Sequence, residues 1–179
     1  YSMGGAIVAR FAADEPDRVE RLILLAPAGV AYEPSRLLAT ARDGGVFGAW
    51  LWGLLGGRQL MKGARSDAKT SSALPDLPKR MRAELRRRGY LRAILSSERH
   101  TLDQSLKAVH REISAMYIPT LAIWGRDDTA IPIRSVGEFA AWNRTARQEV
   151  IEGAGHGLVH THPKEVLAAI REFLREVPE

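Results

Sequence analysis

The sequence predicts an α/β fold, in which a mostly parallel sheet is flanked by helices and interrupted by an inserted helical segment. Three observations support this fold class. Helical apolar patterns alternate with short runs of branched apolar residues at both ends of the chain. Each such run is followed by a loop rich in Gly, Pro or Asp. The middle of the chain lacks these runs and has helical patterns only.

The composition is that of an ordinary globular protein. The chain has 179 residues, of which 45% are hydrophobic and 26% charged, enough for one domain with a sizeable core. No run reaches ~18 apolar residues, so we expect no integral membrane span. The chain has no Cys, which excludes disulfides and a Cys nucleophile. These features do not determine the cellular compartment of the protein, and we expect the cytoplasm.

The formal net charge is +5 and the isoelectric point is about 9.9. Basic residues are concentrated in one segment, Lys79 to Arg92. No aromatic interleaving or known binding motif accompanies this segment. We therefore interpret it as the solvated face of a helix and expect no nucleic-acid partner.

The chain begins with a helix pattern. Apolar residues at helical spacing predict a helix over residues 3–14. Ser2 followed by Gly4 at its start matches the second half of a nucleophile elbow, G-x-S-x-G, where the small residue lets helix and strand approach. Taken alone, this short match favours an ordinary helix N-cap at Ser2 over a catalytic residue.

A buried strand is predicted over residues 19–25, closed by Pro27. Residues 30–117 follow without a strand pattern, and we expect them to form a helical cap or lid. Two tryptophans, Trp50 and Trp52, lie there in an apolar, glycine-flanked helix. They are candidates for a pocket that binds an apolar substrate, and equally for side chains that only hold the insertion on the core.

Strand and helix alternate again after residue 117. The patterns predict strands over residues 118–125 and 148–151, and helices over 133–143 and 163–177. The core is thus expected to comprise residues 1–29 and 118–179.

Three chemically complementary side chains follow predicted strands or, for Ser2, lie where a strand would have ended. The set is the Ser2 hydroxyl, a carboxylate at Asp127 or Asp128, and the His156 imidazole. Groups at the carboxyl ends of parallel strands converge even when they are distant in sequence. A Ser hydroxyl needs a His base, and the resulting imidazolium needs an oriented carboxylate. The sequence therefore predicts a nucleophilic triad in the order Ser, Asp, His.

Four stretches together carry a family resemblance: SMGG with its Ala-rich helix, RLILLAPAG, PTLAIWGRDDTAIP and IEGAGHGLVHTHP. The chain resembles the C-terminal part of an α/β-hydrolase fold protein, beginning at the nucleophile elbow, with residues 30–117 at the position of the variable cap. The resemblance covers the whole chain outside the cap, and its motifs are specific to the superfamily but not to one substrate.

The resemblance also implies roles. The family pattern Gly-x-x-Asp selects Asp128 over Asp127, and the nucleophile and base carry over to Ser2 and His156. The Met3 N–H would be one oxyanion donor. A Ser nucleophile is typical of the esterase and lipase branches, whereas haloalkane dehalogenases and epoxide hydrolases have Asp there. The implied activity is hydrolysis of a carboxylic ester through an acyl-enzyme intermediate, without a cofactor. The apolar cap favours a small-molecule ester with a medium or long apolar acyl chain.

Three alternatives remain open. The same triad would serve C–C bond hydrolysis or cofactor-free perhydrolysis. The resemblance also implies upstream strands and a second oxyanion donor, on the order of a hundred residues. We therefore expect that a missing N-terminal segment of the same fold is a partner of this chain, which would then be inactive alone.

A metal site is the remaining possibility near the histidine. His160 and His162 lie close to His156 in sequence, but no Cys or carboxylate set accompanies them. We therefore expect no metal.

Overall fold

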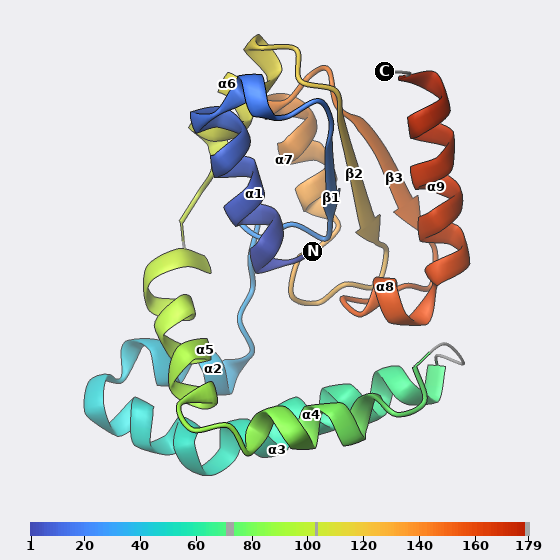
Figure 1. Ribbon diagram of the computed structural model, residues 1–179. Helices are drawn as coiled ribbons and strands as arrows, with labels where there is room; N and C mark the ends of the chain where they lie inside the picture. The colour runs from blue at the N-terminus through green and yellow to red at the C-terminus, as the bar shows by residue number, and fades with distance from the viewer. Residues whose placement is uncertain (71–73, 103, 178–179) are drawn as a thin grey trace. The chain divides into compact units, whose positions relative to one another are not determined.

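The computed structural model describes residues 1–70, 74–102 and 104–177 (Figure 1). The chain divides into two compact units. The first, here called the sheet unit, comprises Tyr1–Glu33 and Gln104–Glu179. The second, here called the helical unit, comprises Pro34–Asp103.

The sheet unit contains three parallel strands, which confirms the predicted α/β fold class. They are β1 (Leu22–Leu25), β2 (Thr120–Gly125) and β3 (Arg147–Ile151), in the order β1-β2-β3. Leu25 pairs with Ile123, and Gly125 pairs with Ile151. Every residue of the central strand β2 is buried, as expected for a strand covered on both faces.

Helices flank both faces of this sheet (Figure 1). On one side α1 (Met3–Asp14) packs on β1, and α6 (Lys107–Ala115) contacts α1 and α7 (Arg134–Trp142). On the other side α9 (Pro163–Glu176) packs on β2 and β3. The buried core on the α9 side is continuous and contains Ala26, Leu121, Ile123, Ile151, Ala154, Leu158, Val166 and Phe173. Two short elements, the 3₁₀ turn η1 (Pro16–Arg18) and α8 (Leu158–Thr161), complete the unit.

Helix α6 belongs to the sheet unit, so the insertion ends earlier in the chain than expected. The cap was expected over residues 30–117, whereas residues 30–33 and 104–117 belong to the sheet unit. The physical reason is packing: the His110 ring of α6 lies edge-on to Phe139 of α7, with 4.7 Å between ring centroids. His110 and Phe139 are both fully buried.

The helical unit contains α2 (Arg36–Asp43), α3 (Gly45–Thr70), α4 (Leu77–Leu85), α5 (Tyr90–Ser97) and a π-helical turn, η2 (Glu98–Leu102). Its described residues include no strand, as predicted. Its core is formed by Leu38, Ala41, Trp52 and Leu95. Part of the link expected between the helices, residues 71–73, lies outside the described residues. Across the described part of the chain, no helix is both long and apolar enough to cross a membrane.

The basic segment Lys79 to Arg92 was predicted to be one helix, and this prediction is wrong. The structure divides it between α4 and α5, with a turn over residues 86–89. Gly89 adopts a φ of +87° at this turn, a left-handed conformation that only Gly adopts without strain. The glycine therefore ends the helical path.

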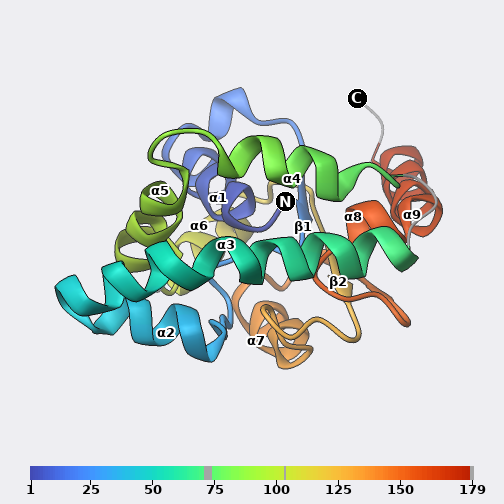
Figure 2. The same ribbon diagram turned by 90° about the horizontal axis from the view of Figure 1, so that it is seen from below.

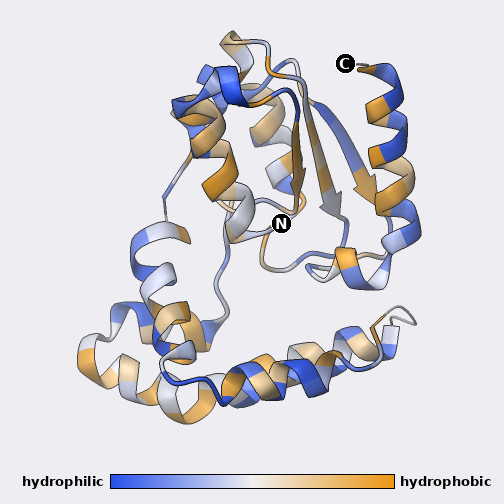
Figure 3. Ribbon diagram, in the orientation of Figure 1, coloured by the Kyte–Doolittle hydropathy of each residue, from blue (hydrophilic) through white to orange (hydrophobic). Residues whose placement is uncertain are grey.

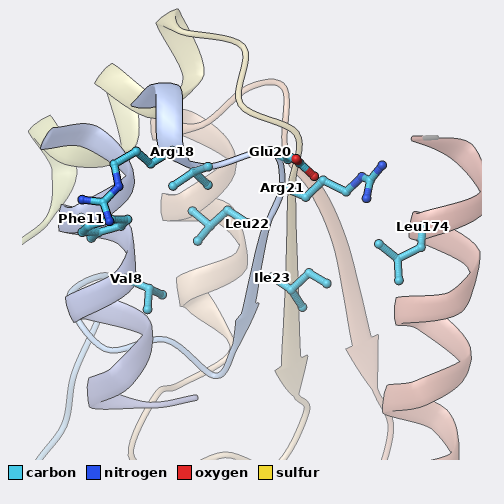
Figure 4. Close-up of a pocket in the computed structure, with 9 residues that line it drawn as sticks. Val8, Phe11, Arg18, Glu20, Arg21, Leu22, Ile23 and Leu174 are labelled. Carbon is cyan, nitrogen blue, oxygen red and sulfur yellow. The ribbon is translucent and has the colours of Figure 1, made fainter. Parts of the chain in front are cut away.

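Strand β1 is at an edge of the described sheet, and a surface hollow of about 560 Å³ lies beside it (Figure 4). Apolar side chains from three elements line the hollow, among them Val8 and Phe11 of α1, Ile23 of β1 and Leu174 of α9. Phe11 is 41% exposed, with the Arg18 guanidinium 5.2 Å from its ring centroid.

The buried His110 makes stability depend on pH. Burial lowers the pKa of His110 from 6.5 to about 4, and neither ring nitrogen has a hydrogen-bond partner among the described residues. The unfolded chain binds a proton between these two values and the folded chain does not, so stability falls as pH drops through this window. From pH 7 to pH 5 we expect a loss of about 2 kcal/mol from this group.

The measurement is urea unfolding at pH 7 and pH 5, compared between the wild type and His110→Leu. Other groups titrate in both proteins, so the informative quantity is the difference between the two losses. The variant should lose about 2 kcal/mol less. Equal losses in the two proteins would contradict a buried, neutral His110.

Candidate active site

Ser2 occupies a sharp turn directly before α1. Its backbone has φ 51° and ψ −125°, a region that a non-glycine residue rarely adopts. Three backbone hydrogen bonds hold it there. The Ser2 N–H donates to Leu25 O (2.9 Å), and the Ser2 carbonyl accepts from Gly5 N (2.9 Å) and Ala28 N (3.1 Å). The turn is therefore fixed to the carboxyl end of β1.

The glycine that permits this close approach is Gly5. A Cβ at Gly5 would lie 2.8 Å from Pro27 Cβ, whereas no atom lies within 4 Å of a Cβ built at Gly4. The sequence motif predicted this role for Gly4, and the open space around that residue shows that the prediction is wrong. Gly5 faces the Pro27 turn after β1, so it is the residue that lets α1 pack against this strand.

Asp128 lies in the loop after β2 and is almost completely buried, with 1% of its side chain exposed. Its Oδ1 accepts hydrogen bonds from Ala130 N and Ile131 N, both at 2.8 Å. Two amide donors fix the plane of the carboxylate and leave Oδ2 for another partner. Asp127, its neighbour, is exposed.

The loops after β2 and β3 meet at Gly125. A Cβ on this residue would lie 2.5 Å from Ala154 O and 2.7 Å from Gly155 O. The Asp127 N–H also donates to Ala154 O at 2.9 Å. The absence of a side chain at Gly125 thus lets the Asp128 loop and the His156 loop lie against each other.

His156 lies between Ser2 and Asp128. Its Nδ1 is 2.8 Å from Asp128 Oδ2, and its Nε2 is 3.0 Å from Ser2 Oγ. Its side chain is 32% exposed. The structure therefore brings together the three residues that the sequence predicted, as one hydrogen-bonded chain from hydroxyl to imidazole to carboxylate.

Tyr1 is a neighbour of this chain that the sequence analysis did not identify. Its hydroxyl donates to the His156 backbone carbonyl at 2.9 Å, and its ring centroid is 5.3 Å from that of His156. The contact joins residues 155 positions apart. No local sequence pattern signals such a contact, because Tyr1 occupies a variable position of the G-x-S-x-G motif.

The other candidate residues differ in their surroundings. Met3 begins α1, so its N–H belongs to the first helical turn, where amides lack intrahelical acceptors. Trp52 is buried in the core of the helical unit and donates from Nε1 to Leu91 O (2.9 Å). Trp50 is 59% exposed.

Both tryptophans line a hollow of about 450 Å³ within the helical unit. Their assignment to a substrate pocket stays a prediction.

The neighbouring histidines have other contacts. His160 lies edge-on to Tyr1, with ring centroids 6.4 Å apart, and His162 Nδ1 is 2.9 Å from Thr161 Oγ1. Over the ranges that the structure describes, no group of three or more His, Cys, Asp or Glu side chains could hold a metal ion.

Comparison with known proteins identifies the family. The family model described as "Serine aminopeptidase, S33" matches residues 1–162. The chain belongs to this family. It is accordingly an α/β-hydrolase, in agreement with the three-strand parallel sheet and its flanking helices.

Curated relatives of this S33 family chain include two with different activities. It is 21% identical over 199 residues to the human "Monoacylglycerol lipase ABHD6", covering 98% of this chain and 53% of the relative. It is 27% identical over 183 residues to "2-hydroxymuconate semialdehyde hydrolase" of Pseudomonas putida, covering 98% and 60%. The chain therefore spans little more than half the length of these relatives.

Solved structures share the fold. A meta-cleavage product hydrolase from Pseudomonas fluorescens IP01 matches with a TM-score of 0.69 and 18% identity, covering 99% of this chain and 63% of that one. A thermophilic esterase from Thermogutta terrifontis matches with a TM-score of 0.66 and 22% identity, covering 98% and 63%. At these identities the likeness concerns the fold alone.

The contact at Gly125 gives a testable expectation. Gly125→Ala places a methyl group against two backbone carbonyls that cannot move independently, so we expect a loss of about 1–3 kcal/mol in unfolding free energy. Gly137→Ala is the matched control, because open space surrounds that position in α7 and Ala favours a helix by about 0.5–1 kcal/mol. Urea unfolding measures both. A Gly125→Ala protein as stable as the wild type would show that the two loops are not held against each other.

Proposed function

We propose that this chain carries the catalytic residues of a serine hydrolase that cleaves carboxylic esters through an acyl-enzyme intermediate. The observation that supports the proposal is the hydrogen-bonded chain Ser2–His156–Asp128 at 3.0 and 2.8 Å. Both distances are within hydrogen-bond reach, as nucleophilic catalysis requires of a hydroxyl, its base and the orienting carboxylate.

Each residue has one role in the proposed reaction. His156 Nε2 accepts the Ser2 proton as Oγ attacks the ester carbonyl, and later returns a proton to the leaving alcohol. Nδ1 keeps its proton, which it donates to Asp128 Oδ2. The hydrogen bonds that Oδ1 accepts from two backbone N–H groups hold the carboxylate in the orientation that favours this tautomer. The ester carbonyl oxygen becomes an oxyanion, to which the Met3 N–H donates.

The turn at Ser2 suits this role because it fixes the nucleophile. The three backbone hydrogen bonds of Ser2 leave its hydroxyl as the group free to react. Water then attacks the acyl-enzyme carbonyl, with His156 again as base, and releases the acid. No step requires a metal or cofactor.

For the substrate we propose an ester with an apolar acyl group. The sequence favours this class, because its inserted helical segment is apolar around Trp50 and Trp52. The match to a monoacylglycerol lipase, whose name denotes an ester of a fatty acid, points the same way.

C–C bond hydrolysis is the second candidate, and a specific observation favours it. The 2-hydroxymuconate semialdehyde hydrolase of Pseudomonas putida is 27% identical over 183 residues, a higher identity than that of the lipase. The triad would serve either reaction, because both form a tetrahedral species at a carbonyl carbon. The substrate distinguishes the two functions.

Substitutions in the triad test the mechanism. Assayed together with the N-terminal segment expected above, Ser2→Ala should abolish turnover of p-nitrophenyl esters and labelling by a fluorophosphonate probe, because the attacking oxygen is lost. Asp128→Asn should lower kcat by a factor on the order of 10⁴, since the amide favours the wrong histidine tautomer. Asp127→Asn is the matched control, because this neighbour is exposed and the carboxylate hydrogen-bonded to His156 is that of Asp128, so its kcat should be unchanged.

Two results would contradict the assignment. Fluorophosphonate labelling that persists in Ser2→Ala would place the nucleophile elsewhere. Equal losses of kcat in Asp127→Asn and Asp128→Asn would show that Asp128 does not orient His156.

The choice between ester and C–C hydrolysis depends on the substrate. Turnover of a 2-hydroxy-6-oxo-dienoate that exceeds turnover of esters, with the same dependence on Ser2, would select C–C hydrolysis.

A further inference from the structure

The two units carry opposite net charge. Residues 34–103 contain fourteen Lys or Arg against six Asp or Glu, a net charge of +8. The remaining residues contain twelve Lys or Arg against fifteen Asp or Glu, a net charge of −3. The formal charge of +5 for the whole chain therefore conceals a strongly basic helical unit. Such a unit attracts an anionic partner.

Many of these cations have no anionic partner in the part of the chain that the structure describes. Within the described residues only three of the unit's cations form ion pairs, with acids next in sequence or one helical turn away: Arg42, Arg80 and Arg87. The other exposed cations of α3, α4 and the turn after α4 have no carboxylate within 4 Å among the described residues: Arg58, Lys62, Arg65, Lys69, Lys79, Arg82, Arg86 and Arg88. The cationic surface is thus available to an external anion.

Helix α3 exposes large apolar side chains at its N-terminal end. Val46 is 89% exposed, Phe47 66%, Trp50 59% and Leu54 55%. Val46, Trp50 and Leu54 are four residues apart and lie on one helical face. The Phe47 and Trp50 rings stack with their centroids 5.9 Å apart. A cluster of this kind marks an interaction surface, because exposing it to water is costly.

An apolar recess adjoins this cluster. The hollow of about 450 Å³ is lined by Val46, Trp50 and Leu54 of α3 and by Leu91 and Leu95 of α5, with Arg92 also on its lining. The recess joins hydrocarbon surface to a guanidinium group. A phospholipid presents the same pair of chemistries, an acyl chain and a phosphate.

The basic side chains continue along the same elements. Helix α3 passes from apolar side chains near its start to Arg58, Lys62, Arg65 and Lys69 toward its end. Helix α4, which carries Lys79, Arg80 and Arg82, lies beside α3 (Figure 2). Figure 3 shows hydrophilic colour throughout the turn between α4 and α5.

We propose that the helical unit docks on the surface of an anionic phospholipid bilayer. Val46, Phe47, Trp50 and Leu54 enter the interfacial layer, and the lysines and arginines of α3 and α4 contact lipid phosphates. Aromatic and apolar side chains combined with a cationic surface are typical of helices that lie in a membrane interface. Each Lys or Arg near an anionic membrane contributes about 1 kcal/mol to binding.

Two other occupants fit the surface less well. A second copy of the unit would bring two net charges of +8 together, which is repulsive. Single-stranded nucleic acid stacks its bases on aromatics interleaved with cations. Here the aromatics gather at one end of α3, away from the basic side chains of its other end.

Vesicle flotation of the whole protein tests the proposal, with phosphatidylcholine vesicles that contain no anionic lipid or 30% phosphatidylglycerol. The wild type should bind the anionic vesicles, and binding should fall steeply with added salt. The combined variant Arg82→Gln, Arg86→Gln, Arg88→Gln should bind on the order of a hundredfold more weakly. The matched control Arg10→Gln, Arg171→Gln, Arg175→Gln removes three exposed cations from the sheet unit and should bind like the wild type.

The apolar arm uses Phe47→Ser with Trp50→Ser. This variant should lose at least about tenfold in affinity and also lose the blue shift of tryptophan emission on vesicle binding. Its control is Tyr117→Ser, which removes an exposed aromatic from the sheet unit. Each variant should remain folded, because the substituted positions are exposed, and circular dichroism checks this.

The outcomes separate this proposal from the catalytic one. Ser2→Ala should bind vesicles like the wild type, so a failed hydrolase assignment leaves the docking surface intact. Equal binding to neutral and anionic vesicles, or unchanged binding by the Arg variant, would overturn the proposal. So would tighter binding to a single-stranded oligonucleotide than to vesicles, or a dimer that the Phe47 and Trp50 substitutions abolish.

Discussion

The parallel pairing of β2 with β1 and β3 is the constraint on which the candidate site depends. Because the three strands run in the same direction, the loops that follow them open at one edge of the sheet (Figure 1). Asp128 follows the end of β2 by three residues and His156 follows the end of β3 by five. Ser2 is bonded to the last residue of β1. A slip of one residue in either pairing would separate the imidazole from its partners.

Much of this fold could be predicted from the sequence, because the signals are local. Helix α1 and the buried strand β2 follow from apolar periodicity and from branched residues over a few positions. Membership of α6 in the sheet unit could not, since the His110–Phe139 contact that supports it joins distant parts of the chain. The break in the basic segment is marked in the sequence by Gly89 alone, and an isolated Gly is tolerated within a helical pattern.

The triad residues could also be predicted from local signals, whereas their long-range contacts could not. Ser2, Asp128 and His156 each lie in or next to a loop whose position after a strand can be read from the sequence. The contacts that support them cannot be read in this way. The hydrogen bond from the Tyr1 hydroxyl to the His156 carbonyl joins residues 155 positions apart in the sequence. Whether Gly4 or Gly5 meets Pro27 depends on the packing angle of α1, which periodicity does not determine.

Tertiary contacts hold Ser2 in a backbone conformation that is locally unfavourable. Ser2 and Ala26, which lies in the turn after β1, both have positive φ (51° and 41°), a conformation that costs about 1–3 kcal/mol at a non-glycine residue. Each is tied to a strand by its own N–H, Ser2 to Leu25 O and Ala26 to Ile123 O. Ala26 is also fully buried in the core on the α9 side. The strained turn at Ser2 is therefore held by its bonds to the packed sheet, and the conformation of Ser2 depends on β1 and β2.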